Sequence, residues 1–319
     1  MQFSRVVRQD VIVAQLPEQL LPDSEERGLA TTRPDTMAAD ALAAWDALLM
    51  AADECDLTLP ARAHGWSGIQ VLLPFGDWPE NRTLTNILDD ARSGVTGTVD
   101  QADDVRRVHA AHSDVSPQEA MDAVRRSRDA LRAWIEAGGP QDEGLLPTRS
   151  LLGTLPVLTL AHATAFQIAV SARDLQACGA RPHDELTATG LLALVDTTGA
   201  LAARQRATAS MTVRTPSAFL GTGSDGTGWR TADLSELTEP LGPGIIATAA
   251  VVIDIASGRA SVPSLYSSGQ IAVTDLTGLL ALAPIIEGVP GIPAGASLAR
   301  AAKVMNGITG MLGGLFGKR

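Results

Sequence analysis

Aromatic side chains are scarce in this chain: they make up 3% of its 319 residues, and only one of them is a tyrosine. Hydrophobic residues nevertheless reach 45%. We therefore expect cores built from Ala, Leu, Val and Ile, with an alanine content that favours helices in the first half. The two cysteines, Cys55 and Cys178, exclude a disulfide framework or a cysteine-rich metal site. We interpret both as small core residues.

Basic charge is in the minority, since the chain carries a net charge of −11. No basic stripe is present to neutralise phosphates, which excludes nucleic acid as the main partner. No uninterrupted apolar run reaches the length of about 18 residues that an ordinary membrane span needs. The opening MQFSRVVRQD lacks the apolar core of a secretory signal. We expect a cytoplasmic protein of about two domains, with any membrane association through a local patch.

The first half of the chain shows helical periodicity. Apolar side chains at three- and four-residue steps predict a helix over residues 35–56. A second helix is predicted within 67–92, where Pro74 and Pro79 break the pattern. An interior proline removes a backbone hydrogen bond and clashes with the preceding turn, at about 3 kcal/mol. The helix is therefore either kinked at Pro74 or starts again near Glu80.

The start of a third helix is the clearest local signal. The segment Ser-Pro-Gln-Glu at 116–119 combines an N-cap, a proline at the first helical position and a capping-box glutamate. The glycines at 138–139 end that helix, and a fourth helix is predicted over 154–178. These lengths fit an antiparallel four-helix bundle over residues 35–181, preceded by an N-terminal arm, 1–34, of no predicted role.

After residue 181 short strands replace the long helices, apart from one more predicted helix over 185–198. Alternating and β-branched segments are typical of strands, and the mixture predicts a small α+β domain over 182–288. Prolines and glycines then mark a linker into a tail, 289–319. The predicted strands are 207–214, 226–231, 245–252 and 270–273, and the remaining predicted helices are 254–258 and 276–286.

A glycine-rich run at 221–228 is superficially like a phosphate-binding loop. It lacks the Gly-Lys-Ser/Thr ending and leads into a strand instead of a helix. We interpret it as a glycine-rich β-turn, with Asp225-Gly226 as a hairpin signal.

The five histidines offer one pair with a spacing that a metal site tolerates. His109 and His112 lie three residues apart, with Asp114 close by, but in a polar stretch that we interpret as a solvated loop or helix end. His162 is interpreted as a hydrogen-bonded packing or rim residue. His64 and His183 are interpreted as isolated loop residues.

Two segments of the predicted bundle resemble a known family. Residues 65–67 read Gly-Trp-Ser and are followed by an apolar segment and Pro74. Near the end of the fourth helix, Gln167 is followed by Ser171 and then by Asp-Leu at 174–175. Both segments resemble the DinB-like, mycothiol-dependent maleylpyruvate isomerase superfamily.

The second half resembles the sterol-carrier-like C-terminal part of the same family. Residues 257–259 read Ser-Gly-Arg and residues 265–271 read LYSSGQI, which look like the GR…SG segment of that fold. The resemblance covers about residues 35–287. It implies an α + α+β protein: an N-terminal antiparallel four-helix bundle, a small sterol-carrier-like α+β domain and an amphipathic C-terminal tail.

The chain departs from the family at the positions that would hold a divalent metal. The resemblance implies a His at Pro74, a Glu at Gln167 and a His at Ser171. Such a site needs carboxylate and neutral imidazole lone pairs, whereas an amide and a hydroxyl are weak ligands and proline is none. Asp174 shares the helix face, but one carboxylate alone does not hold a transition metal tightly. We predict that the metal site is lost and that no cofactor is bound.

The resemblance and its departures predict a non-catalytic protein that binds a lipid or other apolar ligand, or acts as a scaffold or adaptor. The alternative is a mycothiol-dependent, metal-assisted isomerase or thiol transferase, which would need a metal held by residues not identified in the sequence. Apolar residues near the end of the second half are candidates for lining a ligand cavity, although they also fit a filled core: Leu276, Leu279, Leu280, Leu282, Ile285 and Ile286.

Residues 296–319 predict an amphipathic, glycine-rich helix with basic ends. Each glycine costs a helix about 1 kcal/mol, so we expect this helix to be weak alone in water. Three docking modes fit it: a membrane surface, the groove of a partner protein, or the chain's own apolar cavity. The residues expected to make the contact are Leu298, Val304, Met305, Ile308, Met311, Leu312, Leu315, Phe316, Lys318 and Arg319.

Overall fold

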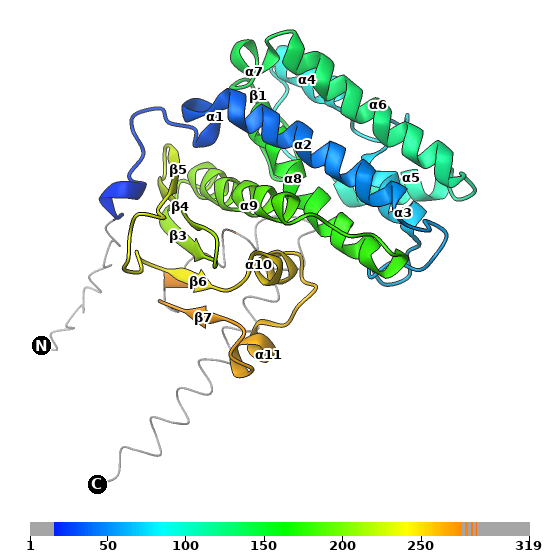
Figure 1. Ribbon diagram of the computed structural model, residues 1–319. Coiled ribbons are helices and arrows are strands. Elements are labelled where there is room, and N and C mark those ends of the chain that lie inside the picture. The colour runs from blue at the N-terminus through cyan, green and yellow to red at the C-terminus, as the bar shows by residue number, and fades with distance from the viewer. Residues whose placement is uncertain (1–15, 276–277, 280–281, 283–284, 286–319) are drawn as a thin grey trace, which may run out of the picture.

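The computed structural model of the chain describes residues 16–275 together with residues 278, 279, 282 and 285 (Figure 1). Helices dominate up to residue 204, and a five-stranded sheet follows. This mixture agrees with the expected α+β class. The predictions for Leu276, Leu280, Ile286 and the tail of residues 296–319 fall outside the described residues and stay predictions.

The long helices predicted for the first half are present. Ser116 caps α6 in a reciprocal capping box with Glu119, which satisfies N–H groups that otherwise have no partner. Gly138, at φ 81°, follows the end of that helix as expected. The helical elements up to residue 178 are η1 (Glu18–Leu20), α1 (Leu29–Thr32), α2 (Pro34–Asp53), α3 (Gly68–Leu72), η2 (Leu73–Phe75), α4 (Leu84–Arg92), α5 (Gln101–Ala111), α6 (Pro117–Glu136), α7 (Gly139–Asp142), α8 (Val157–Asp174) and η3 (Leu175–Cys178).

The helix around Pro74 ends there and is not kinked. Pro74 lies in η2, a short 3-10 turn that closes α3, and α4 starts only at Leu84. Proline lacks the N–H that would continue the α3 ladder. The Asn81 side chain then donates to the carbonyl oxygens of Pro74 (2.7 Å) and Gly76 (2.8 Å). These bonds hold the segment between η2 and α4 as a loop. The helix therefore starts again at Leu84, slightly after the predicted start near Glu80.

Helix α5 was not predicted, because its stretch was interpreted as a loop or helix end. The Asp100 carboxylate accepts from the Asp103 N–H (3.1 Å) and caps the helix. Val108 is fully buried, but most of the helix is exposed or half-buried. With so few apolar positions, the sequence lacks the stripe on which helix prediction depends.

The second half consists of α9 (Asp184–Arg204) and a sheet of order β5-β4-β3-β6-β7. Helix α9 lies between α8 and one face of the sheet (Figure 1). Strands β3 and β6 run parallel, and the other neighbouring pairs are antiparallel. The strands are β3 (Thr208–Arg214), β4 (Phe219–Asp225), β5 (Trp229–Asp233), β6 (Gly244–Ile246) and β7 (Ala272–Val273). A separate two-stranded pair joins β1 (Pro147–Thr148) to β2 (Leu155–Pro156).

The glycine-rich run is mostly strand, so its interpretation as a β-turn was wrong except at Asp225-Gly226, where the chain turns from β4 toward β5. A side chain at Gly223 would collide with the carbonyl oxygen of Leu20 in the N-terminal arm. Leu20 itself is fully buried against the sheet. The glycines therefore let residues of the arm cross closely over β4.

The segment 245–252 is a strand only at its start, so the rest of that prediction was wrong. Thr248 accepts from the Val251 N–H (3.3 Å) and caps α10 (Ala249–Ala256). Val252, Ile253 and Ile255 are buried on this helix, so the burial of β-branched side chains overrides their preference for strands. A short helix, α11 (Val262–Ser267), leads on to β7.

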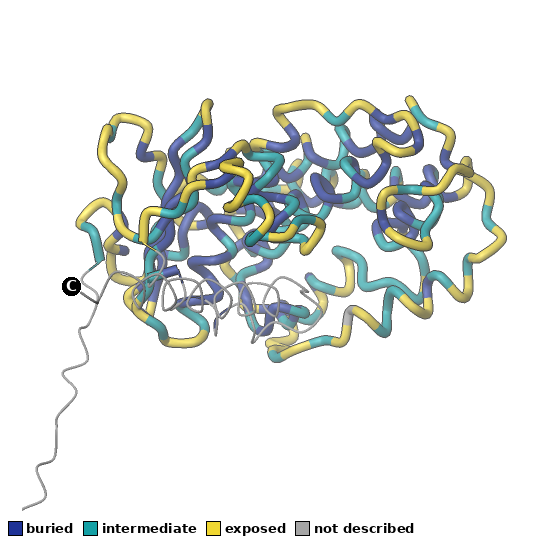
Figure 2. Tube along the Cα trace, turned by 90° about the horizontal axis from the view of Figure 1, so that it is seen from below, coloured by how far each residue is buried: buried dark blue, intermediate teal, exposed yellow. Residues whose placement is uncertain are grey.

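One apolar cluster crosses the predicted domain boundary at residues 181–182. It joins core residues of α2 and α8 to Leu186 and Ala193 of α9 and to Ile253 of α10. Figure 2 shows buried residues in the helical part as well as the sheet. Helix α9 is long and apolar enough to span a membrane by composition, but 67% of its most apolar window is buried inside the protein.

Candidate functional site

A cavity of about 960 Å³ lies between the helical layer and the sheet. Its volume is at the upper end of the range typical of small-molecule sites, about 300–1,000 Å³. Four of the eleven aromatic residues of the chain line it: Trp45, Trp66, Phe75 and Phe166. In a chain so poor in aromatic residues, this concentration distinguishes the cavity from the rest of the core.

The helical end of the cavity is rigidly built. Ser67 caps α3 in a reciprocal box with Gln70, and the following 3-10 turn presents Phe75. The rings of Phe75 and Trp45 meet edge to face, with centroids 5.9 Å apart, a preferred aromatic geometry.

The sheet end of the cavity is mainly apolar. Its side chains come from α9, the sheet, α10 and the segments next to them: Leu194, Leu201, Met211, Val213, Ile245, Val252, Ile255, Ile271, Val273, Leu279 and Leu282. Of the predicted cavity residues, Leu279 and Leu282 therefore lie in the wall. Ile285 is buried in the neighbouring core cluster, outside the set of wall residues.

The three positions matched to the family's metal site all line this cavity. Pro74, Gln167 and Ser171 all belong to its wall. They supply a ring carbon face, an amide and a hydroxyl, which do not fit the carboxylate and imidazole set that a zinc-type ion needs. Among the residues that the structure describes, no group of three or more His, Cys, Asp or Glu side chains is placed to hold a metal.

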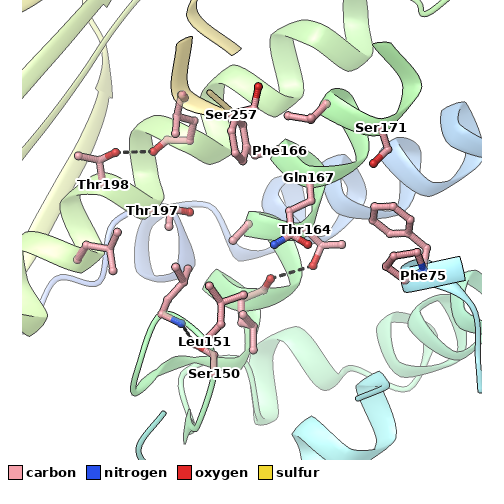
Figure 3. Close-up of a pocket in the computed structure, with 18 of the residues that line it drawn as sticks. Phe75, Ser150, Leu151, Thr164, Phe166, Gln167, Ser171, Thr197, Thr198 and Ser257 are labelled. Carbon is pink, nitrogen blue, oxygen red and sulfur yellow. Dashed lines mark hydrogen bonds between the residues drawn. The ribbon is translucent and has the colours of Figure 1, made fainter. Parts of the chain in front are cut away.

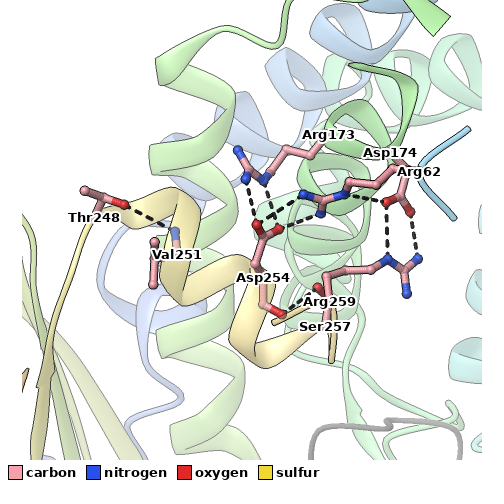
Figure 4. A network of polar contacts seen from close by, with 8 residues as sticks. All are labelled: Arg62, Arg173, Asp174, Thr248, Val251, Asp254, Ser257 and Arg259. Atoms are coloured by element: carbon pink, nitrogen blue, oxygen red, sulfur yellow. Dashed lines mark hydrogen bonds and ion pairs between the residues drawn. The ribbon is translucent and has the colours of Figure 1, made fainter. Parts of the chain in front are cut away.

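Asp174, on the same face of α8 by spacing, is engaged in a separate ion-pair network (Figure 4). Its carboxylate accepts from Arg259 at 2.7 and 3.2 Å and from Arg62 at 3.3 Å. Arg62 continues to Asp254 on α10, which also pairs with Arg173 at 2.8 Å. Burial acts to raise the pKa of Asp254, but the bonds from Arg173 and Arg62 together lower it.

Neutral polar groups are spread through the wall. Figure 3 shows Thr164 and Gln167 between Phe75 on one side and Thr197 on the other. The Thr164 hydroxyl donates to the Leu160 carbonyl at 3.2 Å and so is satisfied within α8. Within the described residues, the side chains of Gln167 and Ser171 make no hydrogen bond.

Arginine charges at the wall are paired. Arg82 bonds to Asp90 at 2.5 Å, and Arg259 is held by Asp174. Ion pairs and hydrogen bonds compensate such partly buried charges.

Acidic groups at the wall are also engaged. Asp104 pairs with Arg107, and Asp100 caps α5. His64, the remaining ionisable wall residue, is exposed.

Helix α5 forms one side of the cavity through Ala102 and Val105. Two histidine–tryptophan contacts attach this helix to the segment between α3 and α4 and the loop before α3. His109 meets Trp66 with ring centroids 4.5 Å apart, and His112 stacks on Trp78 at 4.0 Å.

Both histidines lie at the C-terminal end of α5, so the helix-end alternative holds, and both are half-buried instead of solvated. Burial lowers the pKa of His109, and His112 lies 2.9 Å from the Glu80 carboxylate. The bond with His112 is the main reason that the pKa of Glu80 is lowered.

His162 corrects another interpretation. It is buried on α8, but neither ring nitrogen has a hydrogen-bond partner in the described part of the chain. Burial lowers its pKa to about 4, so the ring is neutral at pH 7. His162 is a packing residue and is not hydrogen-bonded there.

The aromatic residues of the wall did not stand out as a site in the sequence. Their rarity was the signal, because they lie on α2, η2, α8 and the loop before α3 and converge only in the fold. The spacing of these residues along the chain does not predict that they converge.

Comparisons with known proteins place the fold. No protein-family model matches the chain, and no curated protein matches it by sequence. Two solved structures are similar: the mycothiol-dependent maleylpyruvate isomerase and a histidine-to-alanine variant of it. Each aligns with a TM-score of 0.51 at 14% identity, covering 79% of this chain and 96% of the isomerase. At that identity the similarity concerns the fold, which is thus distantly similar to that of maleylpyruvate isomerase.

Proposed function

We propose that this protein binds an apolar small molecule in the cavity between its helical layer and its sheet, without a metal and without catalysing a reaction. The observation that carries the proposal is the cavity wall. It combines four of the eleven aromatic residues with an apolar end on the sheet. Cavities lined mostly by apolar and aromatic groups, with a few polar ones, are typical of ligand sites.

The wall chemistry also supports a role without metal. The residues at the family's ligand positions, Pro74, Gln167 and Ser171, do not offer the lone pairs that a zinc-type ion requires. The finer assignment of the architecture belongs to this proposal: a four-helix bundle built around α2, α6 and α8, followed by a sterol-carrier-like α+β part. In this scheme the ligand lies between the two.

A mycothiol-dependent isomerase or thiol transferase is the second candidate, because the two similar structures are of a mycothiol-dependent maleylpyruvate isomerase. That activity in this chain would need an ion held by other residues. Elemental analysis of the purified protein separates the two functions. Stoichiometric zinc or another divalent metal would favour the isomerase.

Filling the cavity tests the binding proposal. Thr164 and Thr197 both line the cavity and are labelled in Figure 3, so the double change Thr164→Trp/Thr197→Trp adds two indoles to its wall. We expect the uncharged dye N-phenyl-1-naphthylamine to bind the unmodified protein and brighten. The filled variant should bind it at least about tenfold more weakly, because the apolar volume is lost.

The matched control is Ala188→Trp, which adds an indole to an exposed position of α9. Its dye affinity should equal that of the unmodified protein, and circular dichroism should show all three proteins folded. Equal dye binding by the filled variant would place the dye elsewhere and contradict the proposal.

A further inference from the structure

We propose that Gln167 and Ser171 select an uncharged ligand that carries a hydroxyl or carbonyl oxygen. This selection rests on the proposed binding function and specifies the polar part of the ligand. The two residues thus recognise a neutral oxygen at positions where the resembled family places metal ligands.

Helix α8 presents the two side chains to the same space. Residues four apart lie one turn from each other on one face, and both belong to the cavity wall. Gln167 offers an acceptor oxygen and two donor hydrogens, and Ser171 a hydroxyl that both donates and accepts. Within the described residues neither side chain has a partner, in contrast to Thr164, which bonds to its own helix.

The surroundings favour a neutral ligand over a charged one. The arginines and aspartates of the wall are each engaged by an ion pair or a helix cap. An acid or an amine entering the cavity would therefore lose water without gaining an unengaged opposite charge, which is unfavourable. A hydroxyl or carbonyl group loses less hydration energy than an ion when it enters the cavity. It also regains its hydrogen bonds, from the Gln167 amide and the Ser171 hydroxyl.

The remainder of the ligand is apolar. From α8 the cavity continues to the side chains of Met211 and Val213 on β3 and Ile245 on β6. An alkyl chain or a fused hydrocarbon attached to the polar oxygen matches this lining. The recognised class is thus a neutral, mainly apolar molecule with at least one hydroxyl or carbonyl group.

Three probes of equal chain length and different charge test the selection: decan-1-ol, decanoate and decylammonium at pH 7.5. Trp45 and Trp66 line the cavity, so tryptophan emission from the full chain reports occupancy, and dye displacement gives an independent affinity. We expect decan-1-ol to bind at least about tenfold more tightly than either ion.

Gln167→Glu is the diagnostic variant, because it replaces the amide by a carboxylate of the same shape. Decan-1-ol should bind about tenfold more weakly, and decylammonium should overtake it. Gln176→Glu makes the same change at an exposed position and should alter neither affinity. If the Gln167→Glu protein does not fold, Gln167→Leu and Ser171→Ala should each weaken decan-1-ol binding while preserving dye binding.

The outcomes separate this selection from the underlying function. A preference of the unmodified protein for decanoate or decylammonium would overturn the selection and leave the binding function standing. Unchanged probe affinities in all the Gln167 and Ser171 variants would likewise overturn the selection and leave the binding function standing. Failure of the dye and every probe to bind would overturn both.

Discussion

Asp196 is an ionisable residue in the core of the described chain. It is fully buried on α9, and one carboxylate oxygen accepts from Thr231 (2.7 Å), Trp229 (3.1 Å) and the Leu29 N–H (3.1 Å). Its other oxygen has no partner among the described residues. Burial raises the pKa of Asp196 from 3.8 to about 6, although the three bonds partly oppose that rise.

This raised pKa sets the sign of a pH effect. The folded protein prefers protonated Asp196, so the stabilisation is full below pH 3.8 and is lost as the pH rises through about 6. In the Asp196→Asn variant the side chain at this position cannot ionise. Between pH 4 and pH 7 the free energy of unfolding of the unmodified protein should therefore fall by about 2 kcal/mol relative to that variant. Urea unfolding at both pH values measures the difference.

His162 does not obscure the comparison, because it is present in both proteins and cancels. Asp114→Asn, at an exposed position, is the matched control and should show a pH-dependent difference within about 0.5 kcal/mol. Parallel pH profiles of the unmodified protein and Asp196→Asn would contradict the buried-charge account.

At the residue scale the motifs singled out Pro74, Gln167 and Ser171, and all three lie in the cavity wall. Their relation to a lost metal site stays a prediction. Asp196 was not identified, because a single Asp in an apolar helix resembles any exposed polar position until the fold surrounds it. Its partners lie 33 to 167 residues away in the chain, and no local pattern relates them.

The packing of α8 on α9 depends on Gly190. A Cβ built there would lie 2.5 Å from the Ala169 Cβ and 3.3 Å from the Ala165 carbonyl oxygen. Both neighbours belong to α8, so relief requires the helices to separate. Helix propensity alone predicts that Gly190→Ala stabilises by about 1 kcal/mol, whereas overpacking costs typically about 1–3 kcal/mol.

We expect the steric cost to exceed the gain in helix propensity, because the nearest atom is the Ala169 methyl, which is fixed to the α8 backbone. Gly190→Ala should lower the free energy of unfolding by about 1–2 kcal/mol, measured by urea unfolding. The neighbouring Thr189→Ala, at a half-buried position, should change it by less than about 0.5 kcal/mol. A more stable Gly190→Ala protein would show that propensity outweighs the close approach.

At the element scale, prediction succeeded where local chemistry is sufficient. A capping box and a regular apolar stripe located α6 almost to the residue. Helix α5 was missed because it has little buried apolar surface and is attached through rings on other segments. The strand predicted over 245–252 failed for the opposite reason, since tertiary burial gave β-branched residues a helical conformation.

The whole molecule should unfold as one unit. The apolar cluster that includes Leu186, Ala193 and Ile253 lies on both sides of the predicted boundary at 181–182. The Arg62, Asp174 and Asp254 network ties α10 to α8. Scanning calorimetry should therefore show a single transition with equal calorimetric and van't Hoff enthalpies. Two resolved transitions would instead support independent domains over 35–181 and 182–288.

The docking of the arm has a consequence for biosynthesis. Glu26 pairs with Arg230, which lies 204 residues later in the chain, and Leu20 is covered only once β4 and β5 exist. On a translating ribosome Leu20 and Glu26 emerge long before Arg230 and the strands that cover them. Leu20 must therefore stay exposed to water, or bound to a chaperone, until the strands through β5 have been made. The segment around Leu20 and Glu26 is thus made early but reaches its native position only after β5 has been synthesised.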